Sequence, residues 1–207
     1  TRNQTTMIGP NRIDTASVAG RVEAQDGATV RFDLYGPDDS TCSRAPAFTS
    51  TVPLNAGGEA TSEPFTPQLA GTYRWVATYS GDANNEPVAG PCGDPAEMVE
   101  VTKALPSIQT VASPTVARGK AVYDTAQVRG LVNPLPGATV TFRLYTPGDL
   151  ACLMPPVFTS TVPLNADGTA VSQTVAPAIH GTYRWVATYN GDANNQAVSG
   201  DCSDPSE

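Results

Sequence analysis

The side chains with the clearest capacity for chemistry form a group of carboxylates and amides that occurs twice in the chain. Calcium takes six to eight oxygen ligands of these types, so the group is a candidate calcium site. The same residues also suit a tight turn, because Asp and Asn side chains hydrogen-bond to their own backbone. Turn chemistry is the favoured interpretation, and calcium stays open for Asp82, Asn84, Asn85, Asp94 and Glu97 in the first occurrence and Asp192, Asn194, Asn195, Asp204 and Glu207 in the second.

The recurrence extends far beyond this group. Residues 14–97 align with residues 124–207 without a gap, and more than half of the aligned positions are identical. A repeat of about 110 residues is one domain long, so the sequence predicts two tandem domains, residues 1–105 and 106–207. A residue essential to a chemistry that both copies share should occur in both.

Catalysis and cofactor binding find no support by this criterion. His180, the single histidine, aligns with Ala70, so the two copies do not share a nucleophile–histidine pair. Lys103 and Lys120 are not equivalent positions, which argues against a shared isopeptide bond. We find no glycine-rich loop opening a helix, the arrangement that a phosphate site needs. We therefore expect a protein without enzymatic activity and without a cofactor.

Four cysteines are the other reactive side chains, two in each copy at the same offset. Repeat symmetry favours two disulfides, Cys42–Cys92 and Cys152–Cys202. Each would close a loop of about 50 residues, worth about 4 kcal/mol in the chain-entropy model, and would imply an oxidising, extracellular location. In a plain sandwich the two connections leave from opposite ends, so segment 80–97 must run back along the sheet for the sulfurs to meet. Free thiols remain the alternative, and zinc is disfavoured because the chain has no Cys-x-x-Cys.

Charge and hydropathy exclude two classes of partner. The formal net charge is −8, and Lys103 and Lys120 are the only lysines, whereas contact with nucleic-acid phosphates needs a basic surface. No apolar run approaches the 18 or more residues of a membrane-spanning helix. We expect neither nucleic-acid binding nor membrane insertion.

Short segments with period-two alternation dominate each copy and predict an all-β fold. In the first copy they cover residues 3–7, 14–22, 28–35, 48–54, 58–65, 72–79 and 98–104. Seven such strands with one apolar face each are typical of an antiparallel β-sandwich. The segment around Tyr73 resembles a tyrosine corner, in which the hydroxyl turns back to the backbone two residues before a core position. The expected core aromatics are Tyr73, Trp75, Tyr183 and Trp185.

The two copies differ at their ends. The first continues from Glu97 into Met98-Val-Glu-Val, whereas the second stops at Glu207, so we expect the second sandwich to lack its last strand in this chain. Either the chain was cut from a longer array, or a strand from another molecule completes the sheet. Thr1 follows no signal peptide, which we interpret as a processed or cut N-terminus. The short linker 103–109, with Pro106, should be semi-rigid.

Three segments carry a family resemblance: Gly27-Ala-Thr-Val-Arg-Phe, Asn55-Ala-Gly-Gly-Glu-Ala and Ala70-Gly-Thr-Tyr-Arg-Trp-Val-Ala-Thr-Tyr-Ser-Gly-Asp-Ala-Asn85. Through these segments the chain resembles the bacterial Ig-like repeats of secreted and wall-anchored proteins, many of them actinobacterial. The resemblance covers nearly all of both copies. The resemblance implies an Ig-like sandwich that serves as a spacer, stalk or adhesive module. It implies no catalytic residues.

Two functions follow as expectations. The first is an extracellular structural module, a stalk, spacer or filament repeat that contacts neighbouring repeats or associates with itself. The alternative is an adhesin-type module that binds a glycan or a host protein through loops 36–47 and 80–97 and their counterparts 146–157 and 190–207. Loop variation on a fixed scaffold is how such modules acquire binding. The apolar run from Leu150 to Val157 is the best candidate for a partner contact.

Overall fold

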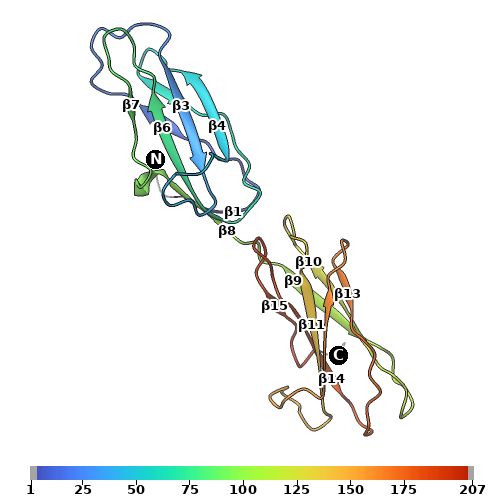
Figure 1. Cartoon of the computed structure of the whole chain (residues 1–207). Helices are drawn as coiled ribbons and strands as arrows, with labels where there is room; N and C mark the ends of the chain where they lie inside the picture. Colours follow the sequence, from blue (N-terminus) through green and yellow to red (C-terminus); the bar gives the residue numbers. More distant parts are fainter. Residues whose placement is uncertain (1–3, 205–207) are drawn as a thin grey trace. The chain divides into compact units, whose positions relative to one another are not determined.

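The computed structural model describes residues 4–204, which divide into two compact units with the boundary between Lys103 and Ala104. Each unit is built from β-strands, and the described residues add a single short 3-10 turn, Pro95–Glu97 (Figure 1). This confirms the predicted all-β fold. Within this part of the chain there is no helix with the length and apolarity to cross a membrane.

Unit 1 pairs a large sheet with a small one. The large sheet has the order β1 (Gln4–Met7), β8 (Met98–Thr102), β6 (Gly71–Tyr79), β3 (Thr29–Tyr35) and β4 (Phe48–Pro53), and β7 (Val88–Ala89) also pairs with β6. Strands β2 (Thr15–Ser17) and β5 (Glu59–Thr61) form the small sheet. All of these pairs are antiparallel except β1 with β8, which is parallel.

Unit 2 has the same framework with different edges. Its first sheet has the order β12 (Phe158–Pro163), β11 (Thr139–Tyr145), β14 (Arg184–Tyr189) and β15 (Val198–Ser199). Its second sheet has the order β13 (Thr169–Val171), β10 (Asp124–Arg129) and β9 (Ser107–Ala112). The described residues of unit 2 contain no counterpart of β8, and residues 205–207 lie outside the described part.

The core of each unit lies between its two sheets. In unit 2 the second sheet contributes Ala126, Val128 and Ala170, and these pack with a buried cluster from β11 and β14. Apolar residues alternate along each strand and therefore point to one face, which is buried against the facing sheet. The arrangement is the predicted antiparallel sandwich and fits an Ig-like fold.

Three of the four expected core aromatics, Tyr73, Trp75 and Trp185, are buried, and Tyr183 is half-buried. Trp75 and Trp185 are almost fully buried, and Trp185 forms a T-shaped pair with Phe158 with ring centroids 6.0 Å apart. The Tyr73 hydroxyl donates to the Leu69 carbonyl oxygen at 3.1 Å, which is the bond that a tyrosine corner requires. Tyr183 makes the same bond to Ile179 at 3.2 Å but is only half-buried, whereas Tyr73 is 3% exposed.

Strand lengths depart from the periodicity in three places, one of them the strand predicted over 58–65, which is only Glu59–Thr61. The strand predicted over 14–22 is only Thr15–Ser17, whereas its counterpart β10 extends over Asp124–Arg129, where it also pairs with β9. The two-residue strand β7, within a segment expected to be a loop, pairs with the end of β6.

The sequence places the domain boundary after residue 105, and the compact units meet between Lys103 and Ala104. Ala104 is 4% exposed, and its N–H donates to the Asn194 carbonyl oxygen at 2.8 Å. Its carbonyl oxygen accepts from the Gln196 N–H at 2.9 Å. Unit 2 therefore begins at a residue that is paired with its own 190–197 loop. The stiffness of the linker stays a prediction.

Candidate functional site

The four cysteines form two disulfides, Cys42–Cys92 and Cys152–Cys202, with Cα atoms 5.9 Å apart in both. This is the pairing that repeat symmetry predicts. It is possible because the chain turns at β7 and returns beside β6, so that β8 begins opposite Arg74. The segment 80–97 therefore runs back along the sheet, as the geometry of the bridge requires.

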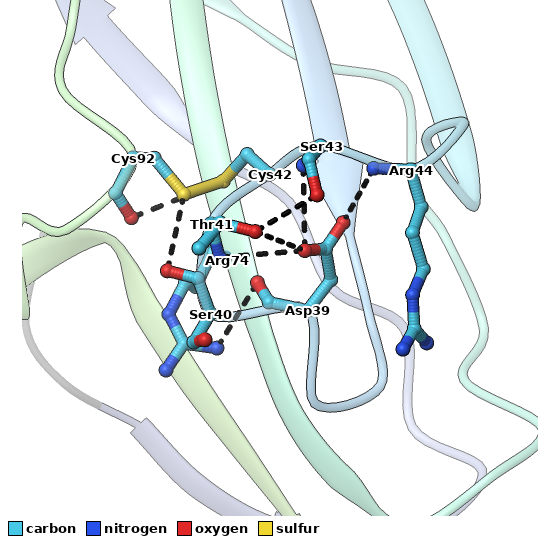
Figure 2. Close-up of a disulfide and its surroundings, with 8 residues drawn as sticks. All are labelled: Asp39, Ser40, Thr41, Cys42, Ser43, Arg44, Arg74 and Cys92. Atoms are coloured by element: carbon cyan, nitrogen blue, oxygen red, sulfur yellow. Dashed lines mark hydrogen bonds between the residues drawn. A yellow bond between two sulfur atoms is a disulfide. The ribbon is translucent and has the colours of Figure 1, made fainter.

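A buried carboxylate organises the loop that carries Cys42. The Asp39 side chain accepts from the backbone N–H groups of Arg44, Ser43 and Thr41 at 3.0, 3.3 and 3.3 Å (Figure 2). These bonds, that from Arg44 above all, lower the pKa of Asp39 against the opposing effect of desolvation. The loop is thus folded by its own aspartate, and Cys42, at a φ of 47°, is held in the left-handed region beside Cys92.

The equivalent loop of unit 2 keeps the aspartate and changes the surface. Asp149 accepts from the Leu153 and Met154 N–H groups at 3.0 and 2.9 Å. Desolvation opposes ionisation there, but the backbone hydrogen bonds outweigh it and the pKa of Asp149 is lowered. The side chains that project from this loop are exposed and apolar, namely Leu150, Leu153, Met154 and Val157, where unit 1 has Ser40, Ser43, Arg44 and Ala47.

The repeated Gly-Asp-Ala-Asn-Asn segments form tight turns. Asp82 accepts from the Asn84 N–H, the Asn85 amide and the Tyr79 hydroxyl at 2.9, 2.7 and 2.9 Å. Desolvation would raise its pKa, but these bonds lower the pKa of Asp82 to about 2. The Asp82 carboxylate therefore accepts hydrogen bonds from both N–H and O–H donors and organises the turn.

The turn also fastens a distant loop. Asn85 accepts from the Val22 N–H at 2.8 Å and donates to the Val22 carbonyl oxygen at 3.0 Å. Asn195 makes the same pair of bonds to Val132. Asn194 and Asn195 are completely buried, and the backbone N–H of Ala104 donates to the Asn194 carbonyl oxygen beside them. The asparagines thus join two loops at one end of each sandwich.

In unit 1 the candidate oxygen ligands divide between two turns. Asp94 caps the 3-10 turn by accepting from the Ala96 N–H at 2.9 Å, at the start of β8, whereas Asp82 follows the far end of β6. Among residues 4–204 no group of three or more His, Cys, Asp or Glu side chains is arranged to hold a metal. Asp204 lies at the end of the described residues, and Glu207 lies outside them.

Sequence reasoning missed a buried carboxylate at the start of the second strand of each copy. Asp14 and Asp124 are 2% and 0% exposed. Their backbone N–H groups donate to the hydroxyl oxygens of Ser62 and Ser172 at 2.9 and 3.0 Å, and their carboxylates accept from the N–H of the next residue, Thr15 or Thr125, at 2.8 and 2.7 Å. Burial raises the pKa of Asp124 to about 7. In unit 1 burial and then the nearby Asp14 carboxylate raise the pKa of Glu97 to about 7. The signal available was the identity of Asp14 and Asp124 at the edge of an apolar strand.

A groove opens on unit 2 where unit 1 is closed. It has a volume of about 550 Å³ and runs between segment 112–120 and segment 179–183, and Trp185 is among the residues that line it. His180 lies on its exposed rim.

The fold and these loops define a class: a disulfide-bonded, all-β sandwich repeat whose duplicated polar residues organise turns and loops. No family model and no curated protein matches the chain.

Proposed function

We propose that the chain is a non-catalytic structural module of an extracellular or cell-surface protein, a repeat within a stalk, spacer or filament. The observation that supports it is the use to which both copies put their shared polar residues. Asp39 and Asp149 fold the cysteine loops, Asp82 and Asp192 fold the turns, and the cysteines link two loops covalently. These shared residues therefore stabilise the fold of their own unit, which is the role expected in a structural repeat.

The disulfides supply two further arguments. They fit an oxidising compartment, as expected for a secreted or surface-exposed chain. Each also links residues 50 positions apart, so the segment between the two cysteines cannot extend when the ends of the unit are pulled. A load-bearing repeat benefits from this limit, because an unfolded unit stays short and can refold.

Single-molecule stretching tests this role. The whole chain is pulled from its two ends, first oxidised and then after reduction of the disulfides. Reduction should lengthen each unfolding step by about 180 Å, since 50 residues extend at about 3.6 Å each. A structural repeat should also refold within repeated cycles while oxidised. Units that unfold at negligible force in the oxidised state, or that fail to refold, would contradict a load-bearing role.

A binding module is the second candidate, and the exposed apolar loop of unit 2 favours it. Leu153 is 85% exposed and Leu150 is 67% exposed, next to the Cys152–Cys202 bridge. The Cys152–Cys202 disulfide joins loop 146–157 to segment 190–207 and so restricts the movement of the loop that carries these leucines. Apolar side chains held outward in this way are typical of a protein contact. The glycan or host protein that such a surface would bind stays a proposal.

The two units provide a matched control for this alternative. A variant in which Leu150, Leu153, Met154 and Val157 take the unit 1 residues Ser, Ser, Arg and Ala removes the apolar surface and keeps Asp149 and Cys152. Binding to a glycan or cell-surface array that is lost in this variant would support the adhesin-type role. Equal signals for the two proteins, or no signal for either, would contradict it.

A further inference from the structure

The outer face of the larger sheet of unit 1 carries a compact set of polar side chains. Arg31 and Asp33 lie on β3 and alternate with the core residues Phe32 and Leu34, so they belong to the face away from the core. The Asp33 carboxylate accepts from the Nε and Nη2 atoms of Arg31 at 3.1 and 3.0 Å and from the hydroxyl of Thr49 at 2.7 Å. This face thus combines one guanidinium, one carboxylate and one hydroxyl.

Unit 2 keeps a guanidinium and the hydroxyl of this set without the carboxylate. On β11 a threonine, Thr141, replaces the arginine of unit 1, and an arginine, Arg143, replaces the aspartate. Thr159 is unchanged between the copies and lies opposite Arg143 on β12. Among residues 4–204 no carboxylate lies within ion-pair distance of Arg143, and its guanidinium donates to the Thr188 hydroxyl at 3.3 Å. The described part of the chain therefore lacks the charged acceptor that Asp33 provides in unit 1.

A row of hydroxyl groups crosses the same face beside Arg143. Thr161, Thr141, Thr188 and Ser199 stand opposite one another on β12, β11, β14 and β15. The hydroxyl oxygens of Thr141 and Thr161 are 3.0 Å apart, and those of Thr188 and Ser199 are 2.8 Å apart. Neighbouring strands are about 4.8 Å apart, so the row is about 14 Å long. The residues at its two ends, Thr161 and Ser199, are exposed.

Two other charged residues lie near the ends of these strands. Arg184, the first residue of β14, occurs in both copies, and its Nη1 atom is buried. Asp201 follows β15, and its carboxylate accepts from the N–H and the hydroxyl of Ser203 at 2.8 and 2.7 Å. Asp201 forms no ion pair with Arg143. Arg143 is therefore the cation that distinguishes this face of unit 2 from that of unit 1.

Unit 1 shows that the last strand of the sandwich does not cover this face. Strand β8 pairs with one edge of β6, whereas β3 and β4 lie on the other side of β6. With β8 in place, the Arg31 side chain is 55% exposed, and Thr49 and Thr51 are exposed. The equivalent face of unit 2, on β11 and β12, is therefore a surface of the sandwich whether or not a last strand is present.

We propose that this face of unit 2 binds an acidic glycan, with the carboxylate of an internal uronate sugar held between Arg143 and Thr159. The inference goes beyond the structural role and does not depend on it, and it places binding on the sheet instead of the loops. The uronate carboxylate would accept from a guanidinium and a hydroxyl, as the Asp33 carboxylate does in unit 1. The hydroxyl row would exchange hydrogen bonds with the neutral sugars beside it.

Charge and position select this ligand over other acidic partners. The chain has a net charge of −8, so it repels an acidic protein with many carboxylates, whereas a glycan that alternates uronates with neutral sugars brings less charge. Arg143 lies on an inner strand of the sheet and has hydroxyl groups on the strands to both sides. Sugars on both sides of the uronate therefore find partners, whereas a sialic acid at the end of a glycan would use one side only.

A hyaluronan hexasaccharide, in which uronates alternate with neutral sugars, is the direct probe. Titrated into the whole chain, it should shift the amide NMR signals around Arg143 and Thr159 and leave those from Leu150 to Val157 unchanged. The control is the same hexasaccharide with its carboxylates reduced to alcohols. It should bind at least about tenfold more weakly, because the charge-assisted hydrogen bonds are lost. Binding of the acidic form should weaken as the salt concentration rises.

The two units supply matched protein variants. Arg143→Gln should lower the affinity for the hexasaccharide at least about tenfold and change the melting temperature by less than about 3 °C, because the side chain lies on the outer face. Thr141→Arg with Arg143→Asp introduces the ion pair of unit 1 and should abolish binding. The reverse exchange, Arg31→Thr with Asp33→Arg, should give unit 1 a site and raise the stoichiometry from one to two hexasaccharides per chain.

The outcomes separate the possibilities. Binding that needs both the uronate carboxylate and Arg143 supports the proposal, and so does a second site in the reverse exchange. No binding of the hexasaccharide, equal binding of its carboxyl-reduced form, or undiminished binding to the Arg143→Gln chain overturns it. Shifts confined to residues 150–157 would assign the glycan to the loop and overturn the site. Tighter binding of sialyllactose or of a polyglutamate peptide would identify another class of acidic ligand and overturn the partner proposed here.

Discussion

The hydroxyl of Tyr189 donates to the Asp192 carboxylate at 2.9 Å, three residues further along the chain. The same carboxylate accepts from the Asn194 N–H at 2.6 Å and from the Asn195 N–H at 2.9 Å. Burial raises the pKa of Tyr189, and the hydrogen bond to Asp192 raises it further. One side chain thereby fixes the end of β14, the turn and the loop that the turn contacts.

Replacement of this carboxylate should destabilise unit 2. Asp192→Ala removes an acceptor shared by several donors, so we expect the free energy of unfolding to fall by about 3 kcal/mol. Tyr189→Phe deletes one bond and keeps the turn, and should cost about 1 kcal/mol. Chemical denaturation followed by the fluorescence of Trp185 measures both, with Trp75→Phe as the common background. Equal effects of the two substitutions would show that Asp192 does not organise the turn.

The buried Asp124 should make unit 2 more stable in mild acid than at neutral pH. Its folded pKa is raised from 3.8 to about 7, mainly by desolvation, so between these values the folded state binds more protons than the unfolded state. Stability is then greatest near pH 4 and is lost as the pH rises through 7, by at most about 4 kcal/mol. Asp124→Asn should flatten this dependence, as measured by denaturation of unit 2 between pH 4 and 8. A wild-type profile that rises over this range would contradict the raised pKa.

Removal of one disulfide should destabilise its own unit alone. The double substitution Cys42→Ser with Cys92→Ser opens a loop whose ends are 50 residues apart, which should cost about 4 kcal/mol in the chain-entropy model. The second unit, with Cys152–Cys202 intact, provides the reference within the same molecule. Calorimetry should show one transition moved to lower temperature and one unchanged. A shift of both transitions would indicate that the units unfold together.

The exposed apolar loop of unit 2 should contribute to surface properties and little to stability. Leu153→Ser with Met154→Arg introduces the unit 1 residues at 85% and 63% exposed positions. The free energy of unfolding should change by less than about 0.5 kcal/mol, because no buried contact is lost. Binding of a hydrophobic fluorescent dye to the folded chain should fall. A large loss of stability would show that these side chains pack within the unit.

The sequence predicts the sandwich from local alternation along the strands, and it predicts the disulfides from the identity between the two copies. Alternation along 72–79 places Trp75 and Tyr79 on one face, and both are buried. Repetition selects the cysteine pairs without any coordinates. Sequence reasoning is weaker where several segments meet: Asp82 and Asp94 are close in sequence, yet Asp82 holds the turn after β6 and Asp94 caps the turn before β8.

By itself, then, the sequence determined the duplication, the alternating strands, the disulfide pairs and the core tryptophans, since each depends on period or on identity between copies. Only the tertiary structure decided the burial of Asp124, the tasks of the aspartates in their loops and the groove beside Tyr183. The physical reason is that a strand forms only where another segment pairs with its backbone N–H and C=O groups, and a carboxylate stays charged only where water or hydrogen-bond donors surround it. In both cases the neighbouring groups come from segments distant in the sequence. The identical segments 71–79 and 181–189 thus form strands of nine and six residues.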